Sequence, residues 1–426
     1  MLKRGIQKWD LVLLVINSII GAGIFGLPSK IFGLSGTWSL VAFFVCALAV
    51  MIFIFCFAEV SSRFDKTGGP YLYAMEAFGG LPGFLTGWLL LLSRIFNYAT
   101  LINLIVIYLS FFSPVFNDAY TRVICIFGIT AFLTFINHIG VKDSARLSNI
   151  FTVAKLIPLA IFVIVGLFTI QPDLINFSQT PSVGAFSTSV LLLIFAFGGF
   201  ESVLINSGEI INPKKNLPFA LILSAVAVTV IYCLIQLVCI GNLPSLATSE
   251  KPLAEAASNF MGKNGGYLIA AGACVSIFGT LNAIMLGGSR LPFAFSNESQ
   301  FPKIFSYISP KHFTPTWSLI LFTITVTAVS LAWSFLAALT IGAIVRVLVY
   351  AMVCISMLKL RNKKPEGDHF KVRHGYFLAI TAIVVSVWLL SASKITEIRD
   401  VAICAAIGFI IYGLQIVIGK NKGKKI

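Results

Sequence analysis

Long apolar stretches follow one another along almost the whole chain, and short polar segments separate them. Many of these stretches contain no charge for about 20 residues, which lets a helix cross about 30 Å of hydrocarbon. The alternating pattern of membrane-barrel strands is absent, so helices are expected. The pattern predicts twelve transmembrane helices, over residues 11–33, 37–62, 82–112, 119–139, 149–170, 185–209, 218–241, 265–290, 317–335, 337–358, 375–393 and 401–419.

Composition argues against a water-soluble fold. Of the 426 residues, 58% are hydrophobic and 11% are charged, whereas a soluble globular domain carries about 25% charged residues. The first apolar stretch follows basic residues, as a signal peptide does, but it continues into glycines and Pro28 instead of a small-residue cleavage site. We therefore interpret it as the first span. The eight cysteines are scattered singly in apolar segments and predict neither a disulfide framework nor a metal site.

The net charge of +15 would also suit a nucleic-acid partner, but the placement of the charges favours a membrane protein. With the N-terminus in the cytoplasm, Lys and Arg concentrate in the cytoplasmic loops and tails. This asymmetry predicts a multi-pass protein of the cytoplasmic membrane with both termini inside and no nucleic-acid partner. The opposite side then carries only a few basic residues, namely Lys30, Arg122, Lys251, Lys263, Lys394 and Arg399.

Two spans contain glycine clusters near their middle. Residues 21–26 (GAGIFG) interrupt the first span and residues 197–200 (FGGF) interrupt the sixth. Small residues that merely allow close helix packing are the alternative, but the two clusters lie five spans apart, as in a fold of two inverted five-helix repeats. We predict a single transporter domain over residues 1–426. It comprises spans 1–5 and 6–10 as repeats over about 9–171 and 184–360, two broken helices, and two extra C-terminal helices over about 374–420.

Such breaks suit a zwitterionic substrate. An amino acid carries a carboxylate and an ammonium group, and both lose water when they enter a membrane. The backbone N–H groups and the positive dipole end of the half-helix after a break suit the carboxylate, while the carbonyl groups that end the half-helix before it suit the ammonium. Glycine also lets a ligand approach the main chain closely. The clusters therefore predict a binding site for a small zwitterion.

Three motifs in order resemble the amino acid/polyamine/organocation (APC) superfamily of permeases, and the likeness covers nearly the whole chain. Residues 19–28 (IIGAGIFGLP) look like the first-helix signature, residues 195–202 (FAFGGFES) are similar to the sixth-helix motif, and residues 279–283 (GTLNA) resemble the eighth helix. Residues 296–300 (SNESQ) replace the usual Ala-Arg-Asp-Gly-like stretch, a departure confined to a cytoplasmic loop. The resemblance implies the fold of the bacterial leucine transporter, no cofactor, and alternating access around a central site.

The resemblance also implies the substrate contacts. The substrate carboxylate would meet the backbone of Ala22 and Gly23, and the ammonium would meet the carbonyl groups of Ile19, Phe195 and Gly198. Aromatic and aliphatic side chains would line the rest of the site, which favours small or neutral substrates over polyamines. The predicted substrate-binding residues are Ile19, Gly21, Ala22, Gly23, Ile24, Tyr98, Phe195, Ala196, Phe197, Gly198, Gly199, Phe200, Asn282 and Ile284.

Charged residues inside the spans are candidates for coupling. A lysine at mid-membrane costs about 2.5–3.5 kcal/mol on insertion scales, so Lys155 should face the protein interior. By resemblance it stands where sodium-coupled relatives hold sodium, and gain and loss of its proton would couple transport to a proton gradient. A lysine that snorkels to the headgroups is the alternative. Glu201 is the second coupling candidate, and it is equally expected to form a structural pair with Arg94 or Arg346.

The sequence therefore predicts a secondary active transporter for proton-coupled uptake of small or neutral L-amino acids, and no enzyme. An amino acid exchanger, an importer of cationic amino acids or amines, and a non-transporting receptor or subunit are the alternatives. An intramembrane enzyme would need a nucleophile and base, or a metal set, at helical spacing in the spans, and the sequence offers none. The expected partners are an amino acid, protons and the lipid bilayer; the sequence does not indicate an oligomeric state.

Overall fold

The structure is a computed structural model that describes residues 7–21, 23–64, 69–139, 144–205, 210–363 and 369–421. Its elements are helices, and a helix or a pair of helices covers each of the twelve predicted spans. Within the described ranges, eight helical stretches are long and apolar enough to cross a membrane, and three shorter apolar helices accompany them. The all-helical membrane fold is thereby confirmed, while the twelve crossings and the inverted repeat stay predictions.

The contacts within the chain divide it into two compact units, each assembled from three separate stretches of sequence. Unit 1 comprises Met1–Thr86, Ile170–Thr248 and Arg346–Lys394, and unit 2 comprises Gly87–Thr169, Ser249–Val345 and Ile395–Ile426. Unit 1 thus contains the beginning of both predicted repeats and unit 2 most of the remainder, but the end of the second repeat, from Arg346 on, belongs to unit 1. The division also runs through two long helices, α5 (Gly80–Leu109) and α14 (Phe335–Arg361).

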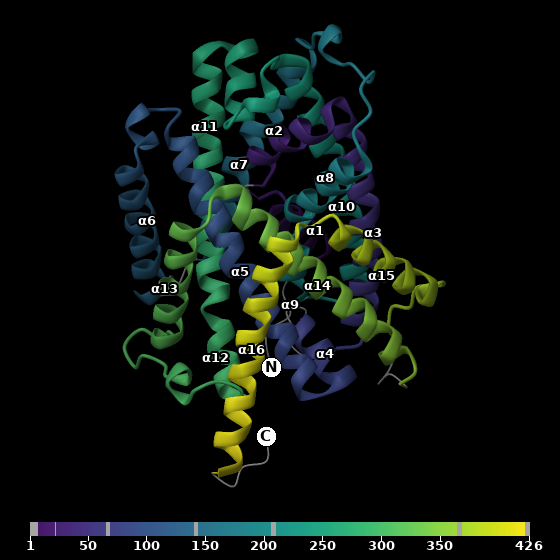
Figure 1. Cartoon of the computed structure of the whole chain (residues 1–426), viewed down its shortest axis with the longest axis vertical. Helices are drawn as coiled ribbons and strands as arrows, with labels where there is room; N and C mark the ends of the chain where they lie inside the picture. Colours follow the sequence, from purple (N-terminus) through teal and green to yellow (C-terminus); the bar gives the residue numbers. More distant parts are fainter. Residues whose placement is uncertain are drawn as a thin grey trace. The chain divides into compact units, whose positions relative to one another are not determined.

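Unit 1 contains both spans with glycine clusters. Its helices are α1 (Lys8–Ile19), α2 (Gly23–Ser35), η1 (Gly36–Trp38), α3 (Ser39–Ser61), α4 (Pro70–Phe78), η3 (Pro172–Leu174), α8 (Val183–Phe197), α9 (Phe200–Ile205), α10 (Pro213–Asn242), η5 (Leu246–Thr248), α15 (Gly375–Ser391), the start of α5 and the end of α14. Helix α3 packs against α10, α8 and α15, and α1 packs against α10 (Figure 1). Large apolar side chains fill this core because the helices are apolar on nearly every face.

Both glycine clusters interrupt their helices in unit 1. The first span ends as α1 at Ile19 and starts again as α2 at Gly23. The sixth ends as α8 at Phe197 and starts again as α9 at Phe200. Glycine has no Cβ and loses more conformational freedom than other residues in a helix, so paired glycines are natural points for a helix to stop. The interruptions therefore lie where the sequence predicts them.

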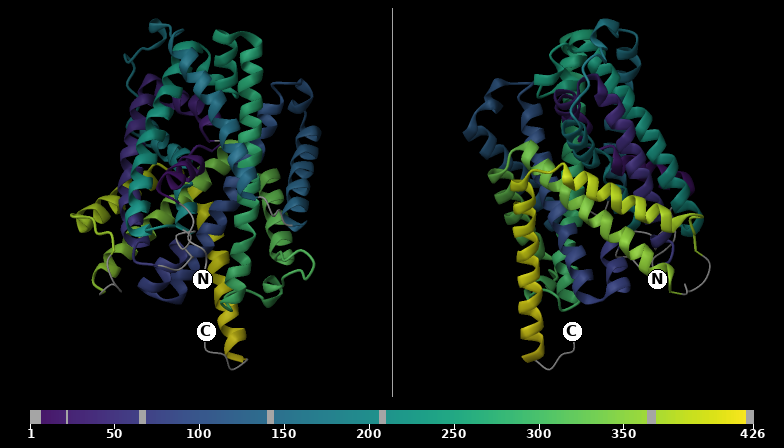
Figure 2. Two further views of the ribbon diagram at one scale, coloured as in Figure 1. Left: turned by 180° about the vertical axis from the view of Figure 1, so that it is seen from behind. Right: turned by 45° about the vertical axis from the view of Figure 1, so that its right-hand side comes forward.

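Unit 2 is built on two helix pairs. Helix α7 packs on α11 and α6 packs on α13 (Figure 2, left). Gly262, with φ of 70°, bends α11 near its start. The helices of this unit are the remainder of α5, η2 (Pro114–Asn117), α6 (Ala119–Ile139), α7 (Ser144–Leu167), α11 (Pro252–Gly288), α12 (Arg290–Asn297), η6 (Lys303–Ser306), α13 (Thr316–Ala332), the start of α14, and α16 (Ile395–Asn421).

Candidate functional site

The two helix interruptions lie against each other inside unit 1. Helix α2 contacts α8, and α1 contacts α9. A Cβ atom on Gly23 would lie 3.1 Å from the Cα of Ala196 and 3.1 Å from Cδ1 of Phe195. This is closer than ordinary van der Waals contact, so glycine at position 23 allows the start of α2 to reach the end of α8.

Both the backbone conformation and the lack of space for a side chain require glycine at position 199. Its φ is +117°, a region that residues with a Cβ rarely adopt. A Cβ at this position would also overlap the carbonyl oxygen of Ser18, in the last turn of α1. Only glycine therefore fits where the α8–α9 interruption meets the end of α1.

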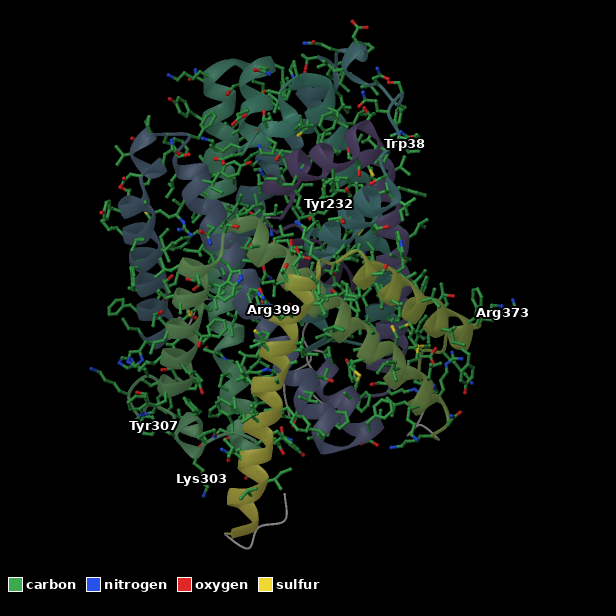
Figure 3. All side chains as sticks on the ribbon, in the orientation of Figure 1. Trp38, Tyr232, Lys303, Tyr307, Arg373 and Arg399 are labelled. Carbon is green, nitrogen blue, oxygen red and sulfur yellow. The ribbon has the colours of Figure 1, made fainter. Side chains whose placement is uncertain are left out.

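A tyrosine of α10 joins the two interruptions. The hydroxyl of Tyr232 lies 3.0 Å from the carbonyl oxygen of Ile19 and 3.1 Å from that of Ala196. Its side chain is fully buried (labelled in Figure 3), and its ring packs edge-on against Phe197. A phenol carries one hydrogen, so it donates to one carbonyl at a time. The Tyr232 hydroxyl is thus a hydrogen-bond donor that the last turns of α1 and α8 share.

An ion pair spans the interruption between α8 and α9. Nη1 of Arg346, on α14, donates to the carbonyl oxygen of Phe195 at 3.0 Å, and its Nε lies 3.7 Å from Oε1 of Glu201. Oε2 of Glu201 accepts from the backbone N–H of Gly199 at 2.8 Å and from the Tyr350 hydroxyl at 3.0 Å. Both charged side chains are nearly inaccessible, at 5% and 6% exposure. The expectation that Glu201 pairs with an intramembrane arginine is therefore confirmed for Arg346.

The same guanidinium explains the glycine at position 198. A Cβ on Gly198 would overlap the Arg346 guanidinium, so a larger residue there would displace the ion pair. Arg346 also lies over the Phe195 ring, 5.6 Å from its centroid. Two of the carbonyl groups predicted to bind an ammonium, those of Ile19 and Phe195, therefore accept hydrogen bonds from the protein itself.

Of the remaining predicted residues of unit 1, Ile24 and Phe200 are buried and Gly21 is partly exposed. Ile24 lies in α2, and Phe200 packs edge-on against Phe57 and at a tilt against Tyr350. Gly21 donates its backbone N–H to the Ile19 carbonyl at 2.6 Å. Ala22, which was expected to bind the carboxylate, lies outside the described residues.

Four predicted residues belong to unit 2. Tyr98 is buried and donates its hydroxyl to Thr130 at 3.1 Å. Asn282 accepts from the side-chain amide of Asn137 at 2.8 Å. Ile284, on α11, and Lys155, on α7, are also buried, with 2% and 4% exposure. Their participation in the substrate site stays a prediction.

Comparison with known proteins decides the family. A family model described as amino acid permease matches residues 6–412. The chain belongs to the amino acid permease family. The permease is 29% identical over 436 residues to the serine/threonine exchanger SteT of Bacillus subtilis (strain 168), covering 99% of this chain and 98% of that protein.

Two other relatives differ in what their names state. The permease is 27% identical over 438 residues to a methylthioribose transporter of the same bacterium, covering 97% and 93% of the two chains. It is 28% identical over 422 residues to the human Asc-type amino acid transporter 1, covering 93% of this chain and 78% of that protein. Together with the apolar helices, these matches show a multi-pass membrane protein of a transporter family.

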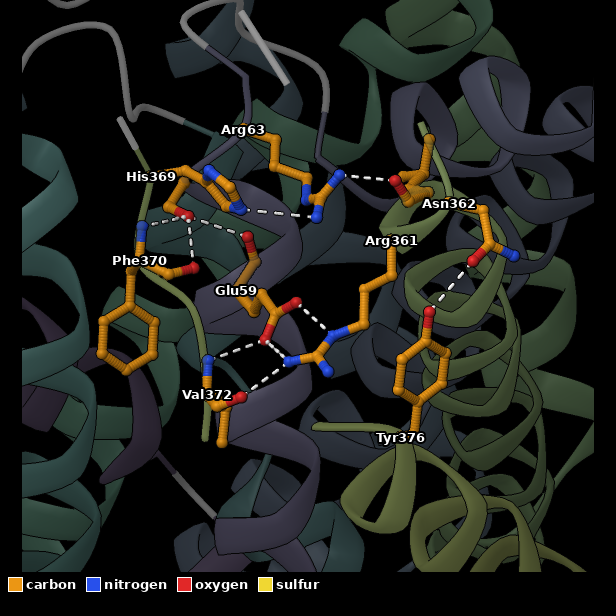
Figure 4. Close-up of polar contacts among 10 residues, drawn as sticks. Glu59, Arg63, Arg361, Asn362, His369, Phe370, Val372 and Tyr376 are labelled. Carbon is orange, nitrogen blue, oxygen red and sulfur yellow. Dashed lines mark hydrogen bonds and ion pairs between the residues drawn. The ribbon is translucent and has the colours of Figure 1, made fainter. Parts of the chain in front are cut away.

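A second buried ion pair of the permease lies at the ends of α3 and α14 (Figure 4). Nε and Nη2 of Arg361 both lie 2.6 Å from the Glu59 carboxylate, and Nη2 also donates to the Val372 carbonyl at 2.7 Å. The backbone N–H of Val372 donates to Glu59 at 2.8 Å, and Arg63 donates to the Leu360 carbonyl. This network fastens the segment before α15 to α3 and α14, a structural role within unit 1.

Neither Tyr232 nor the Glu59–Arg361 pair is among the residues predicted from the sequence. Tyr232 is a phenol in an otherwise apolar span, and Glu59 is a carboxylate at the end of another. Both are weak signals, because tyrosines and terminal carboxylates are common near membrane interfaces. Their significance comes from partners that lie far away in the sequence.

Proposed function

We propose that this permease is a secondary active transporter of small, neutral L-amino acids in the cytoplasmic membrane, with both termini in the cytoplasm. The observation that carries this proposal is the contact between two interrupted helices, bridged by Tyr232. Interrupted helices that meet near mid-membrane offer main-chain groups to a substrate without leaving polar groups exposed to lipid. The family and its amino acid transporters support the substrate class.

The charges of an amino acid suit this arrangement. The start of α2 at Gly23 presents backbone N–H groups and the positive end of a helix dipole, which suits the substrate carboxylate. The end of α8 presents carbonyl groups, which suit the ammonium. Phe195 and Phe197 add apolar surface for a small side chain, so the part of the proposed site that lies in unit 1 is built from Gly21–Ile24 and Phe195–Phe200.

The division of the chain supports an alternating-access cycle. Both interruptions belong to unit 1, which contains the beginning of both predicted repeats. Packed helices move as rigid bodies more readily than they deform, because their cores are close-packed. In the proposed cycle unit 1 therefore carries the helix interruptions as one body while access to the substrate alternates.

Proton coupling through Lys155 is the proposed driving mechanism. Lys155 lies in α7 with 4% exposure, so the protein encloses its side chain. Lys155→Ala should abolish the stimulation of uptake by an inward proton gradient in proteoliposomes. Full gradient-driven uptake by this variant would refute the assignment. Glu201 is the second candidate, and Glu201→Gln should then remove the stimulation instead.

Exchange without proton coupling is the second candidate mechanism, because a relative that matches nearly the whole chain is named an exchanger. Counterflow separates the two mechanisms. An exchanger accumulates labelled amino acid only when the vesicles contain unlabelled amino acid, whereas a proton symporter also takes it up into empty vesicles and responds to an uncoupler.

The substrate class is tested by thermal unfolding of the purified permease with the common amino acids, with amines and with methylthioribose, at two pH values. Ligands that bind the folded state raise its apparent stability. Small neutral amino acids should give the largest shifts. Stabilisation by methylthioribose alone, or binding of amino acids without accumulation in liposomes, would contradict the proposed function.

A further inference from the structure

Two histidines that lie far apart in the sequence meet in unit 2. His138 is in the last turn of α6, and His312 is in the turn that leads into α13. Helices α6 and α13 pack against each other (Figure 1), and a hydrogen bond of 2.8 Å joins the hydroxyl groups of Thr134 and Thr323. The two imidazole rings have centroids 5.0 Å apart and are inclined at 54°. Both histidines are half-buried, so a hydrated ion can reach the pair.

Hydrogen bonds fix the position of this pair. The Thr314 hydroxyl donates to the His138 carbonyl at 3.0 Å. The turn around His312 is closed on itself. The Ser309 N–H donates to the Thr314 carbonyl, and the Phe313 N–H donates to the Ser309 carbonyl, each at 2.9 Å. The two rings are therefore held near each other before any ligand arrives, which lowers the ordering cost of binding.

The separation of the rings suits a shared metal ion. An imidazole nitrogen lies about 2.0–2.1 Å from a zinc ion that it binds. At this bond length, two rings that bind one ion at a tetrahedral angle have their centres about 5 Å apart, and the observed separation is 5.0 Å. Within the described residues no third histidine, cysteine, aspartate or glutamate completes the set, so water takes the remaining positions.

We propose that His138 and His312 form a binding site for one divalent transition-metal ion of the class of Zn²⁺, Ni²⁺ and Cu²⁺. Imidazole nitrogen suits these ions, whereas Mg²⁺ and Ca²⁺ prefer oxygen ligands. The bound ion links the end of α6 to the turn before α13 and so stabilises unit 2. This site is independent of the proposed transport function, because neither histidine is among the predicted substrate-binding residues.

Thermal unfolding of the full-length protein in detergent, without an affinity tag, tests the site. Zn²⁺ and Ni²⁺ should raise the unfolding temperature, EDTA should reverse the shift, and Mg²⁺ should have no effect. Equilibrium dialysis with metal analysis should find one ion per chain that depends on the pair. His138→Gln and His312→Gln should each weaken zinc binding at least tenfold, since even loss of a ligand's outer hydrogen-bond partner costs about 10–100-fold.

His374→Gln is the matched control, because His374 is exposed and belongs to unit 1. It should keep the wild-type zinc affinity. The proposal is overturned if zinc does not stabilise the wild type, if both variants of the pair bind zinc as the wild type does, or if His374→Gln weakens binding equally.

A spectroscopic measurement on the wild type covers the case in which a variant fails to fold. Electron spin-echo modulation of the protein with one equivalent of Cu²⁺ should show coupling to two imidazole nitrogens, and a spectrum without that coupling overturns the proposal. Failure of the proposed transport function is distinguishable, because it appears as absent amino acid binding in the wild type and leaves the metal measurements unchanged.

Discussion

The two helix interruptions meet in one unit but are held in different ways. The interruption between α8 and α9 is spanned by charged side chains, Arg346 at one end and Glu201 at the other. The end of α1 is held by a neutral phenol, Tyr232, and by the close approach of Gly199 to the Ser18 carbonyl. In the proposed site, an incoming ammonium would therefore compete with a guanidinium at the first interruption and with a weaker, uncharged donor at the second.

The two interruptions therefore differ in how firmly they are held. Charged hydrogen bonds are roughly twice as strong as neutral ones, so the α8–α9 interruption is the more firmly fixed. The α1–α2 interruption is the easier of the two to rearrange around a ligand. Substitutions at each interruption test whether the two are held with different strength.

The largest effect should follow from Arg346→Met. Removal of one partner from a buried ion pair is strongly destabilising, so we expect a loss of about 3–5 kcal/mol in the free energy of unfolding. Arg346→Met/Glu201→Gln should lose less than the single variant. Thermal unfolding in detergent measures both, and a double variant that loses as much as Arg346→Met, or more, would contradict this expectation.

Gly199→Ala should cost about 2–5 kcal/mol, because it combines a strained φ with overlap of the Ser18 carbonyl. Transport should be lost, since the two interruptions would be forced apart. Gly128→Ala is the control, as a Cβ on Gly128 meets no atom within 4 Å. A tolerated Gly199→Ala with wild-type transport would refute the close contact.

Tyr232→Phe should cost about 1–3 kcal/mol, because the carbonyl groups of Ile19 and Ala196 lose a buried hydroxyl donor. The effect should be smaller than that of Arg346→Met, in keeping with a neutral contact. Tyr307→Phe, at an exposed side chain (Figure 3), should leave stability unchanged. A loss as large as that of Arg346→Met would remove the distinction between the interruptions.

Gly23→Ala should have the smallest effect on stability, about 1 kcal/mol, because its neighbours must yield by only a few tenths of an ångström. Its effect on binding should be greater, at least a tenfold loss in affinity for a neutral amino acid, since the backbone here is proposed to meet the carboxylate. Gly184→Ala, in open surroundings at the start of α8, is the control. Unchanged affinity in Gly23→Ala would place the carboxylate elsewhere.

Local features of this protein could be predicted from its sequence. The apolar stretches gave the positions of the helices, and the glycine clusters gave both interruptions, because helix formation and helix breaking depend on residues close together in the chain. The motifs around these clusters also indicated the permease family, which the match over residues 6–412 confirms.

The partners across the fold were decided by tertiary structure alone. Periodicity could not choose between Arg94 and Arg346 as the partner of Glu201, since it gives neither the rotation nor the depth of one helix against another. The same limit hid Tyr232, whose acceptors lie 213 and 36 residues away along the chain. The positions of the backbone interruptions follow from local residues alone. Which charges and hydroxyl groups form hydrogen bonds with the backbone there depends on the packing of distant helices, because no local pattern encodes the distances between them.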